Sequence, residues 1–118
     1  MYRDPSLFLD DIKTSAAKIM RYTEGTNRAA FETDEKTLDA VVRNLAIIGE
    51  AVKKLPAELK DRYTGVEWRK IAGLRDFVIH EYFGIDTEIL WDVVSTKIPE
   101  LLSYVNEIIS SEDLSQRD

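Results

Sequence analysis

The chain has 118 residues, 44% hydrophobic and 32% charged, which fits one globular domain spanning 1–118. No apolar run approaches the roughly 18 residues of a membrane span, and the N-terminus lacks the apolar core of a signal peptide, so we expect no membrane association. Zero cysteines exclude disulfides and thiolate metal sites and fit a reducing, cytoplasmic setting. A net charge of −6 weighs mildly against a nucleic-acid ligand, unless the contact with that ligand is local.

The N-terminal third begins with a strong helix signal. Asp4-Pro5 has the pattern of an N-cap followed by proline at the first helical position. Apolar residues then recur at helical spacing as far as Gly25, which predicts a helix over about 5–24. The polar segment 25–33 is predicted to be a mobile loop.

The middle of the chain predicts a second long helix and a short one. Thr33 or Asp34 is placed to cap the second helix, and a wide apolar stripe follows. Pro56 ends that stripe, and the segment 56–63 predicts one short helix.

The C-terminal half predicts two more long helical stretches. The first covers about 66–82, and Asp86 or Thr87 caps the second. Pro99 lies inside the second stretch, so we expect a kink or break just before it, and the polar tail 110–118 is expected to fray. The chain has no strand-period segment, so the sequence predicts an all-α bundle of four main helices plus a short one.

One stretch combines several chemical groups. Arg75 is a fixed cation, Asp76 a carboxylate, His80 the only histidine, and Tyr82 a phenol. On a helix, Asp76 and His80 share a face, whereas Arg75 and His80 lie roughly 140° apart. A long arginine side chain, a frayed helix end at Gly84 or a second copy of the chain would be needed to bring them together.

These residue types suit cleavage of RNA without a metal ion. Such cleavage needs a base for the ribose 2′-OH, a cation for the phosphorane and an acid for the leaving 5′-oxygen. His80 can act as base or acid, Arg75 can hold phosphate oxygens, and Asp76 can fix the imidazole tautomer. The alternative is that His80 is a capping or interface residue and Tyr82 a packing aromatic. With one histidine and no cysteine, we expect neither a metal site nor a cofactor.

Arg75-x4-His80-x-Tyr82 resembles the signature of the HepT-like toxins, members of the HEPN superfamily of α-helical ribonucleases. The blocks 43–51, 68–76, 80–86 and 88–91 also resemble the family in order and spacing, so the resemblance covers about residues 5–108.

This resemblance implies a HEPN-type homodimer with its active site at the two-fold interface. It implies a metal-independent endoribonuclease acting on RNA, with Arg75 and His80 catalytic and Asp76 supporting. It also implies a toxin of a type VII-like toxin–antitoxin pair. The antitoxin partner would be an MntA-like minimal nucleotidyltransferase that adds AMP to Tyr82, and the adduct would block phosphate access.

Two further expectations concern the second helix and the overall role. The polar insertions Arg43, Asn44 and Glu50 are expected to line the same cleft, although a solvated face with a close helix contact at Gly49 is the simpler interpretation. The competing function is a non-catalytic helical binding or regulatory subunit of a nucleotidyltransferase complex. The acidic charge favours that alternative, and the intact motif favours the ribonuclease.

Overall fold

The computed structural model describes the backbone of residues 4–80 and 86–116 and the side chains of residues 4–77 and 86–112. Every regular element in these ranges is helical, which confirms the predicted all-α class. The elements in chain order are α1 (Pro5–Thr23), α2 (Arg28–Thr33), α3 (Glu35–Lys54), α4 (Ala57–Arg62), α5 (Trp68–His80), α6 (Thr87–Asp92), the π-helical segment η2 (Val93–Lys97) and α7 (Ile98–Gln116). None of these helices is long and apolar enough to cross a membrane.

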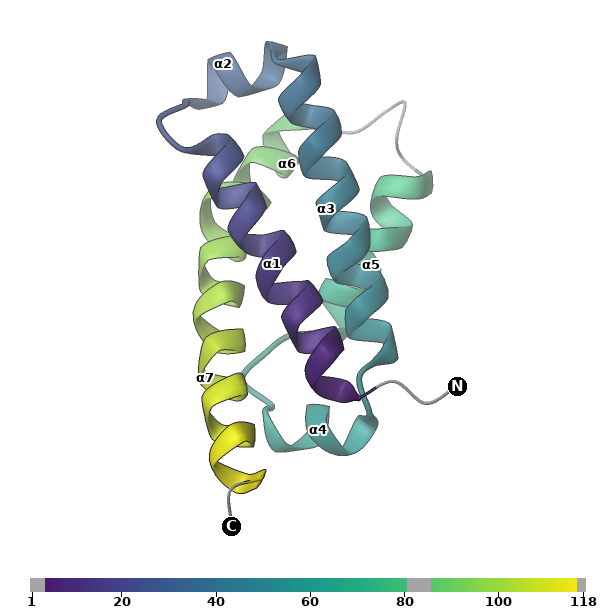
Figure 1. Ribbon diagram of the computed structural model, residues 1–118. Helices are drawn as coiled ribbons and strands as arrows, with labels where there is room; N and C mark the ends of the chain where they lie inside the picture. Colours follow the sequence, from purple (N-terminus) through teal and green to yellow (C-terminus); the bar gives the residue numbers. More distant parts are fainter. Residues whose placement is uncertain (1–3, 81–85, 117–118) are drawn as a thin grey trace.

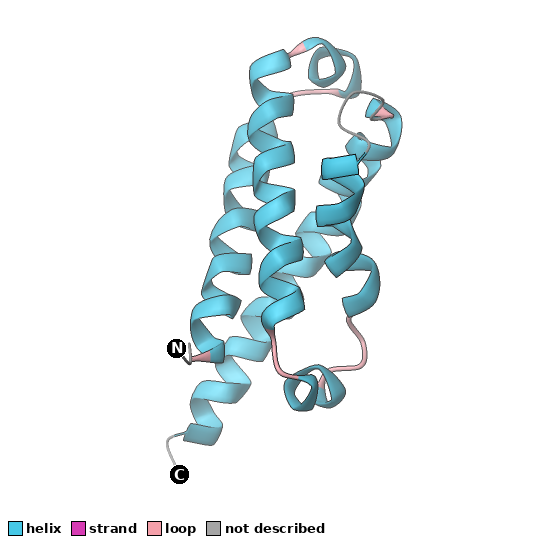
Figure 2. Ribbon diagram, turned by 90° about the vertical axis from the view of Figure 1, so that its right-hand side faces the viewer, coloured by secondary structure: helices cyan, strands magenta, loops and turns pink. Residues whose placement is uncertain are grey.

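The four long helices stand side by side in the order α7, α1, α3, α5, within an envelope of 50 × 29 × 25 Å. Helix α1 packs against α3 and α7, while α5 packs chiefly against α3. Figure 1 shows α2 joining α1 to α3 at one end of the bundle and α4 leading from α3 to α5 at the other. Figure 2 is turned so that the side of the bundle with α5 faces the viewer, and α5 lies beside α3 at the edge of the bundle. Among the described side chains of α5, only Trp68 is buried.

The core lies between α1, α3 and α7, and its residues follow the helical spacing seen in the sequence. Each is at most 4% exposed, and burial of a valine, leucine or isoleucine side chain is worth about 1.5–3 kcal/mol. The principal members are Leu9, Ile12, Ala16 and Ile19 of α1, Val41, Leu45, Ile48 and Val52 of α3, and Leu101, Val105 and Ile108 of α7.

Aspartate caps begin three of the helices: Asp4 as predicted, and Asp34 and Asp86 as one of the two candidates predicted for each helix. The Asp4 carboxylate accepts a hydrogen bond from the Ser6 backbone N–H at 2.9 Å. This hydrogen bond stabilises the charged carboxylate and so lowers the pKa of Asp4. Asp34 rather than Thr33 caps α3 and accepts from the Thr37 backbone N–H at 3.1 Å. Asp86 rather than Thr87 caps α6.

The loop predicted over 25–33 is wrong for its last 6 residues, because Arg28–Thr33 forms helix α2. Asn27 caps this helix through the Ala30 backbone N–H at 2.9 Å. Phe31 is fully buried and its ring lies 5.1 Å from that of Trp91, centroid to centroid. A helix of one and a half turns is too short to show periodicity, so tertiary contacts stabilise it instead. Besides the Phe31–Trp91 contact, Arg28 Nη2 lies 3.3 Å from Glu88 Oε2 of α6.

The disturbance expected before Pro99 takes the form of a π-helical segment. The Ile98 N–H donates to the Val93 carbonyl, five residues back, at the end of η2. Proline lacks an N–H and cannot continue the α-helical hydrogen bonding with the carbonyl four residues earlier. The chain absorbs this by widening the turn before Pro99, and the helix then continues as α7.

Helix α7 extends to Gln116, further than the fraying expected for 110–118. Glu112 accounts for part of this length, because it accepts hydrogen bonds from Arg62 Nη2 at 2.5 Å and the Tyr63 hydroxyl at 2.7 Å. Arg62, the last residue of α4, and Tyr63, its C-cap, thus hold a turn that its polar composition alone would leave loose.

Candidate active site

Arg75 lies where α3 and α5 come closest. A Cβ placed on Gly49 would be 2.7 Å from the Arg75 backbone N, 2.8 Å from the Arg75 Cβ and 3.1 Å from the Ala72 carbonyl oxygen. Only glycine leaves room for this approach, which confirms the close helix contact expected at Gly49. The backbone of Arg75 is therefore held directly against α3.

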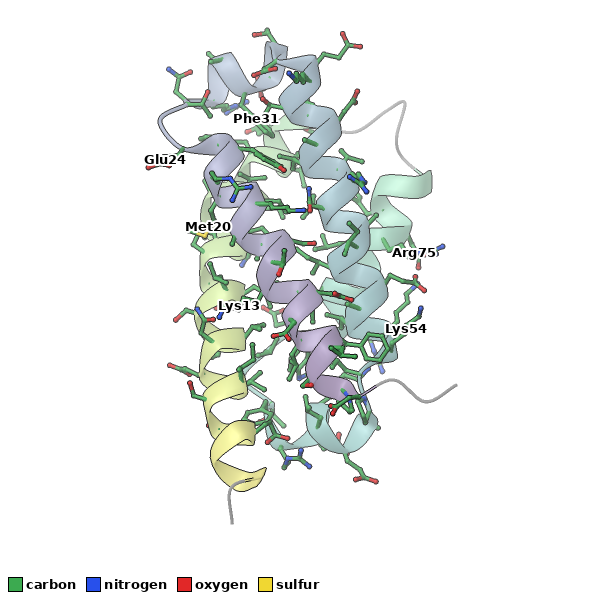
Figure 3. The ribbon with its side chains drawn as sticks, in the orientation of Figure 1. Lys13, Met20, Glu24, Phe31, Lys54 and Arg75 are labelled. Atoms are coloured by element: carbon green, nitrogen blue, oxygen red, sulfur yellow. The ribbon has the colours of Figure 1, made fainter. Side chains whose placement is uncertain are left out.

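The side chain of Arg75 is held by carboxylates from both helices. Glu50 Oε2 lies 2.7 Å from Arg75 Nε, and Asp76 Oδ1 lies 3.7 Å from Arg75 Nη1. The Arg75 side chain remains 40% exposed. Figure 3 shows Arg75 on α5 and Lys54 at the end of α3, both at the side of the bundle where α5 lies. The guanidinium is thus oriented by the protein and still open to solvent.

Two lysines of α3 complete a charged cluster, which we define as Glu50, Lys53, Lys54, Arg75 and Asp76. Lys53 Nζ lies 3.2 Å from Asp76 Oδ1, and Lys54 Nζ lies 3.8 Å from Glu50 Oε1. Its three cations and two carboxylates give the charged cluster a net charge of +1 on a chain whose formal charge is −6. Each pair is partly exposed and is worth only about 0.2–1 kcal/mol, so the arrangement matters more for local charge than for stability.

The remaining motif residues fall at the limit of what the structure describes. His80 is the last residue of α5, and its backbone follows Arg75 by five helical residues. That spacing corresponds to about 7.5 Å along the axis and roughly 140° around it. The His80 side chain and all of Tyr82 lie outside the described residues. Asp76, one turn before His80, occupies the same helix face, as the spacing predicted.

The comparisons with known proteins identify the family. The family described as Ribonuclease HepT-like matches residues 12–108, most of the chain. This chain belongs to the HepT-like ribonuclease family.

Curated relatives carry matching names. The chain is 43% identical over 107 residues to a Methanocaldococcus jannaschii protein named "Putative RNase MJ0127", covering 91% of this chain and 88% of the relative. It is 39% identical over 110 residues to "Putative RNase TTE0752" of Caldanaerobacter subterraneus, covering 93% and 98%. It is 40% identical over 101 residues to "Probable ribonuclease HepT" of Thermococcus cleftensis, covering 86% and 92%. No solved structure matches the chain.

The second-helix residues of this HepT-like chain divide into two groups. Arg43 is exposed and lines, with Glu50 and Lys54, a shallow depression of about 350 Å³ between α1 and α3. Asn44 departs from the expectation that it lines a cleft, because it is only 5% exposed and its amide donates to the Ala40 carbonyl at 2.8 Å. Arg43 and Asn44 are adjacent on the helix and point in different directions. Arg43 faces solvent, whereas Asn44 points into the bundle and its amide is hydrogen-bonded there.

Sequence reasoning missed the contact between Lys53 and Asp76. This contact joins residues 23 positions apart and depends on how α3 and α5 are aligned. A signal was present, since Lys53 follows Gly49 by one helical turn and therefore lies on the flank of α3 that faces α5. Among the described residues, no group of three or more histidine, aspartate or glutamate side chains is gathered to hold a metal ion.

Proposed function

We propose that this HepT-like chain is an endoribonuclease toxin that cleaves RNA without a metal ion, using Arg75 and His80. The observation that carries the proposal is the Arg75 guanidinium, which is held at the surface by Glu50 within a charged cluster of net charge +1. A fixed, solvent-accessible cation in a locally positive patch of an acidic chain is the feature that a phosphate ligand requires.

In the proposed reaction, a histidine removes the proton of a ribose 2′-OH, and the 2′-oxygen attacks the adjacent phosphorus. Arg75 stabilises the negative charge that accumulates on the phosphorane oxygens. The bond to the 5′-oxygen then breaks, and an acid returns a proton to that oxygen, leaving a 2′,3′-cyclic phosphate and a 5′-hydroxyl. Asp76, one turn before His80, is positioned along the helix to orient the imidazole.

A homodimer would supply the second histidine and cover the exposed side of α5. Within one chain α5 packs chiefly on α3, and its side chains Ile71, Leu74 and Phe77 are only partly buried. The roughly 140° between Arg75 and His80 on one helix also favours a site completed by a partner. In a two-fold interface both copies contribute the same residues, so one histidine can act as base and the other as acid.

The proposed regulation is addition of AMP to Tyr82 by an MntA-like minimal nucleotidyltransferase, the antitoxin of a type VII-like pair. Tyr82 follows His80 by two residues. An adduct there would add bulk and negative charge close to the proposed catalytic residues and would repel RNA.

A second candidate is a non-catalytic binding or regulatory subunit of a nucleotidyltransferase complex. The observation that favours it is the neutralisation of Arg75 by two carboxylates in the isolated chain, together with the formal charge of −6. Under this alternative, the charged cluster would contribute to docking of the nucleotidyltransferase and RNA would remain intact.

The two candidates separate on expression in cells. The ribonuclease predicts growth arrest by the wild-type chain, and no arrest by Arg75→Ala or His80→Ala. Arg69→Ala, which removes an exposed cation from the same helix outside the charged cluster, is the matched control and should still arrest growth. Co-expression with an MntA-like minimal nucleotidyltransferase should restore growth and add the mass of AMP at Tyr82. Normal growth with unmodified wild-type chain at high expression would favour the non-catalytic subunit.

A further inference from the structure

Arg75 is contacted at its backbone and at its side chain by two consecutive residues of α3, Gly49 and Glu50. The Arg75 backbone packs closely against Gly49, and Glu50 Oε2 lies 2.7 Å from Arg75 Nε. Glu50 also pairs with Lys54, one turn further along, whose Nζ lies 3.8 Å from Glu50 Oε1. An arginine side chain has many rotamers, so a carboxylate at its Nε restricts where the guanidinium can lie.

The contact made by Glu50 leaves the terminal edge of the guanidinium available. The ion pairs of Arg75 with the described residues involve Nε and Nη1, and the Nη1 contact with Asp76 is long, at 3.7 Å. Asp76 also has a nearer partner, because Lys53 Nζ lies 3.2 Å away. A phosphate needs two N–H groups side by side to be held bidentately, and the Nη1–Nη2 edge supplies them.

We infer that Glu50 is a positioning residue for RNA cleavage, which acts by orienting the Nη1–Nη2 edge of Arg75 toward the reacting phosphate. This inference rests on the proposed function. Glu50 carries a negative charge, so it opposes RNA binding even as it orients Arg75. Loss of the Glu50 charge raises the net charge of the cluster from +1 to +2. Binding and turnover therefore respond to Glu50 in opposite directions.

The test compares Glu50→Gln with wild type in two measurements. The first is steady-state cleavage of a short RNA oligonucleotide, giving kcat and KM. The second is equilibrium binding of the same RNA to chains that also carry His80→Ala, so that no cleavage occurs. Misplacement of a catalytic group by about 1 Å costs up to roughly 100-fold in rate. We expect kcat to fall about 10- to 100-fold, RNA binding to tighten at least about twofold, and the thermal midpoint to stay the same.

The matched control is Glu107→Gln, which removes one exposed carboxylate from α7, away from the charged cluster. It should leave kcat and binding within about twofold of wild type, which excludes an effect of total charge. A rise in both kcat and binding in Glu50→Gln would overturn the inference, because Glu50 would then only compete with RNA for Arg75. Unchanged kcat, or a parallel loss of kcat, binding and thermal midpoint, would overturn it as well.

Failure of the proposed function gives a different result. In that case the wild-type chain leaves the oligonucleotide intact, and the inference falls with it before any variant is compared. A wild-type chain that cleaves, combined with a Glu50→Gln chain that cleaves equally well, refutes only the role of Glu50.

Discussion

Replacement of Gly49 by alanine tests the close contact that holds Arg75 against α3. The added Cβ would lie 2.7 Å from the Arg75 backbone N and 2.8 Å from its Cβ. Ordinary contacts between such atoms are about 3.5–4.0 Å, so α5 would have to move away by close to 1 Å. Neither obstacle is the mobile end of a side chain, and rotamer changes cannot relieve the clash.

The expected change in the free energy of unfolding is the difference between a packing cost and a gain in helix propensity. Overpacking of this kind costs about 1–3 kcal/mol. Alanine in place of glycine in a helix interior returns about 0.5–1 kcal/mol. Gly73→Ala on α5 is the matched control, since none of the described atoms lies within 4 Å of its added Cβ, and it should show only the gain.

The assay is urea unfolding of wild type, Gly49→Ala and Gly73→Ala followed by helical circular dichroism. We expect Gly49→Ala to be less stable than Gly73→Ala by about 1–3 kcal/mol. We also expect RNA cleavage to drop only in Gly49→Ala, because the shift displaces Arg75 from Glu50. Equal stabilisation by both alanines would refute the close contact and the register of α3 on α5 that depends on it.

Two further predictions concern parts of the fold outside the site. Phe31→Ala should lower the free energy of unfolding in urea by about 3–5 kcal/mol, because it leaves a cavity beside Trp91. Leu7→Ala, at a position 43% exposed, is the control and should lower it much less. Equal losses would contradict the buried position of Phe31. The Tyr63 hydroxyl and Arg62 lower the pKa of the Glu112 carboxyl in the folded chain. This contact therefore adds stability above the usual carboxyl pKa and loses it as pH falls through the lowered pKa. Tyr63→Phe should flatten the pH dependence of unfolding below the usual carboxyl pKa. An unchanged pH profile in Tyr63→Phe would contradict that assignment.

The sequence predicted the elements whose signals are local. The caps Asp4, Asp34 and Asp86 and the apolar spacing of the long helices were all visible in the sequence because a cap and a helix face involve neighbours within one or two turns. Pro99 gave the position of the irregular turn, although not its π-helical form. Helix α2 was missed because Phe31 is its only buried residue and the ring of Trp91 lies sixty positions away in the sequence.

The candidate site could be predicted as a set of residues but not as a geometry. The motif singled out Arg75, Asp76 and His80, and Gly49 indicated a close approach. The pairing of Glu50 with Arg75 and of Lys53 with Asp76 depends on the alignment of two antiparallel helices, which no local pattern encodes. Asn44 shows the converse, because a polar residue beside Arg43 looked like part of a surface and is instead a buried side chain bonded to its own helix.

The most direct test of the central claim is cleavage of a defined RNA by the purified chain in the presence of a metal chelator. The account predicts cleavage by wild type that leaves 2′,3′-cyclic phosphate ends, and no cleavage at a position carrying a 2′-deoxyribose. Arg75→Ala and His80→Ala should each abolish the reaction, while Arg69→Ala should retain it. Full cleavage by Arg75→Ala or His80→Ala, or an intact RNA with unmodified wild-type chain, would contradict the account.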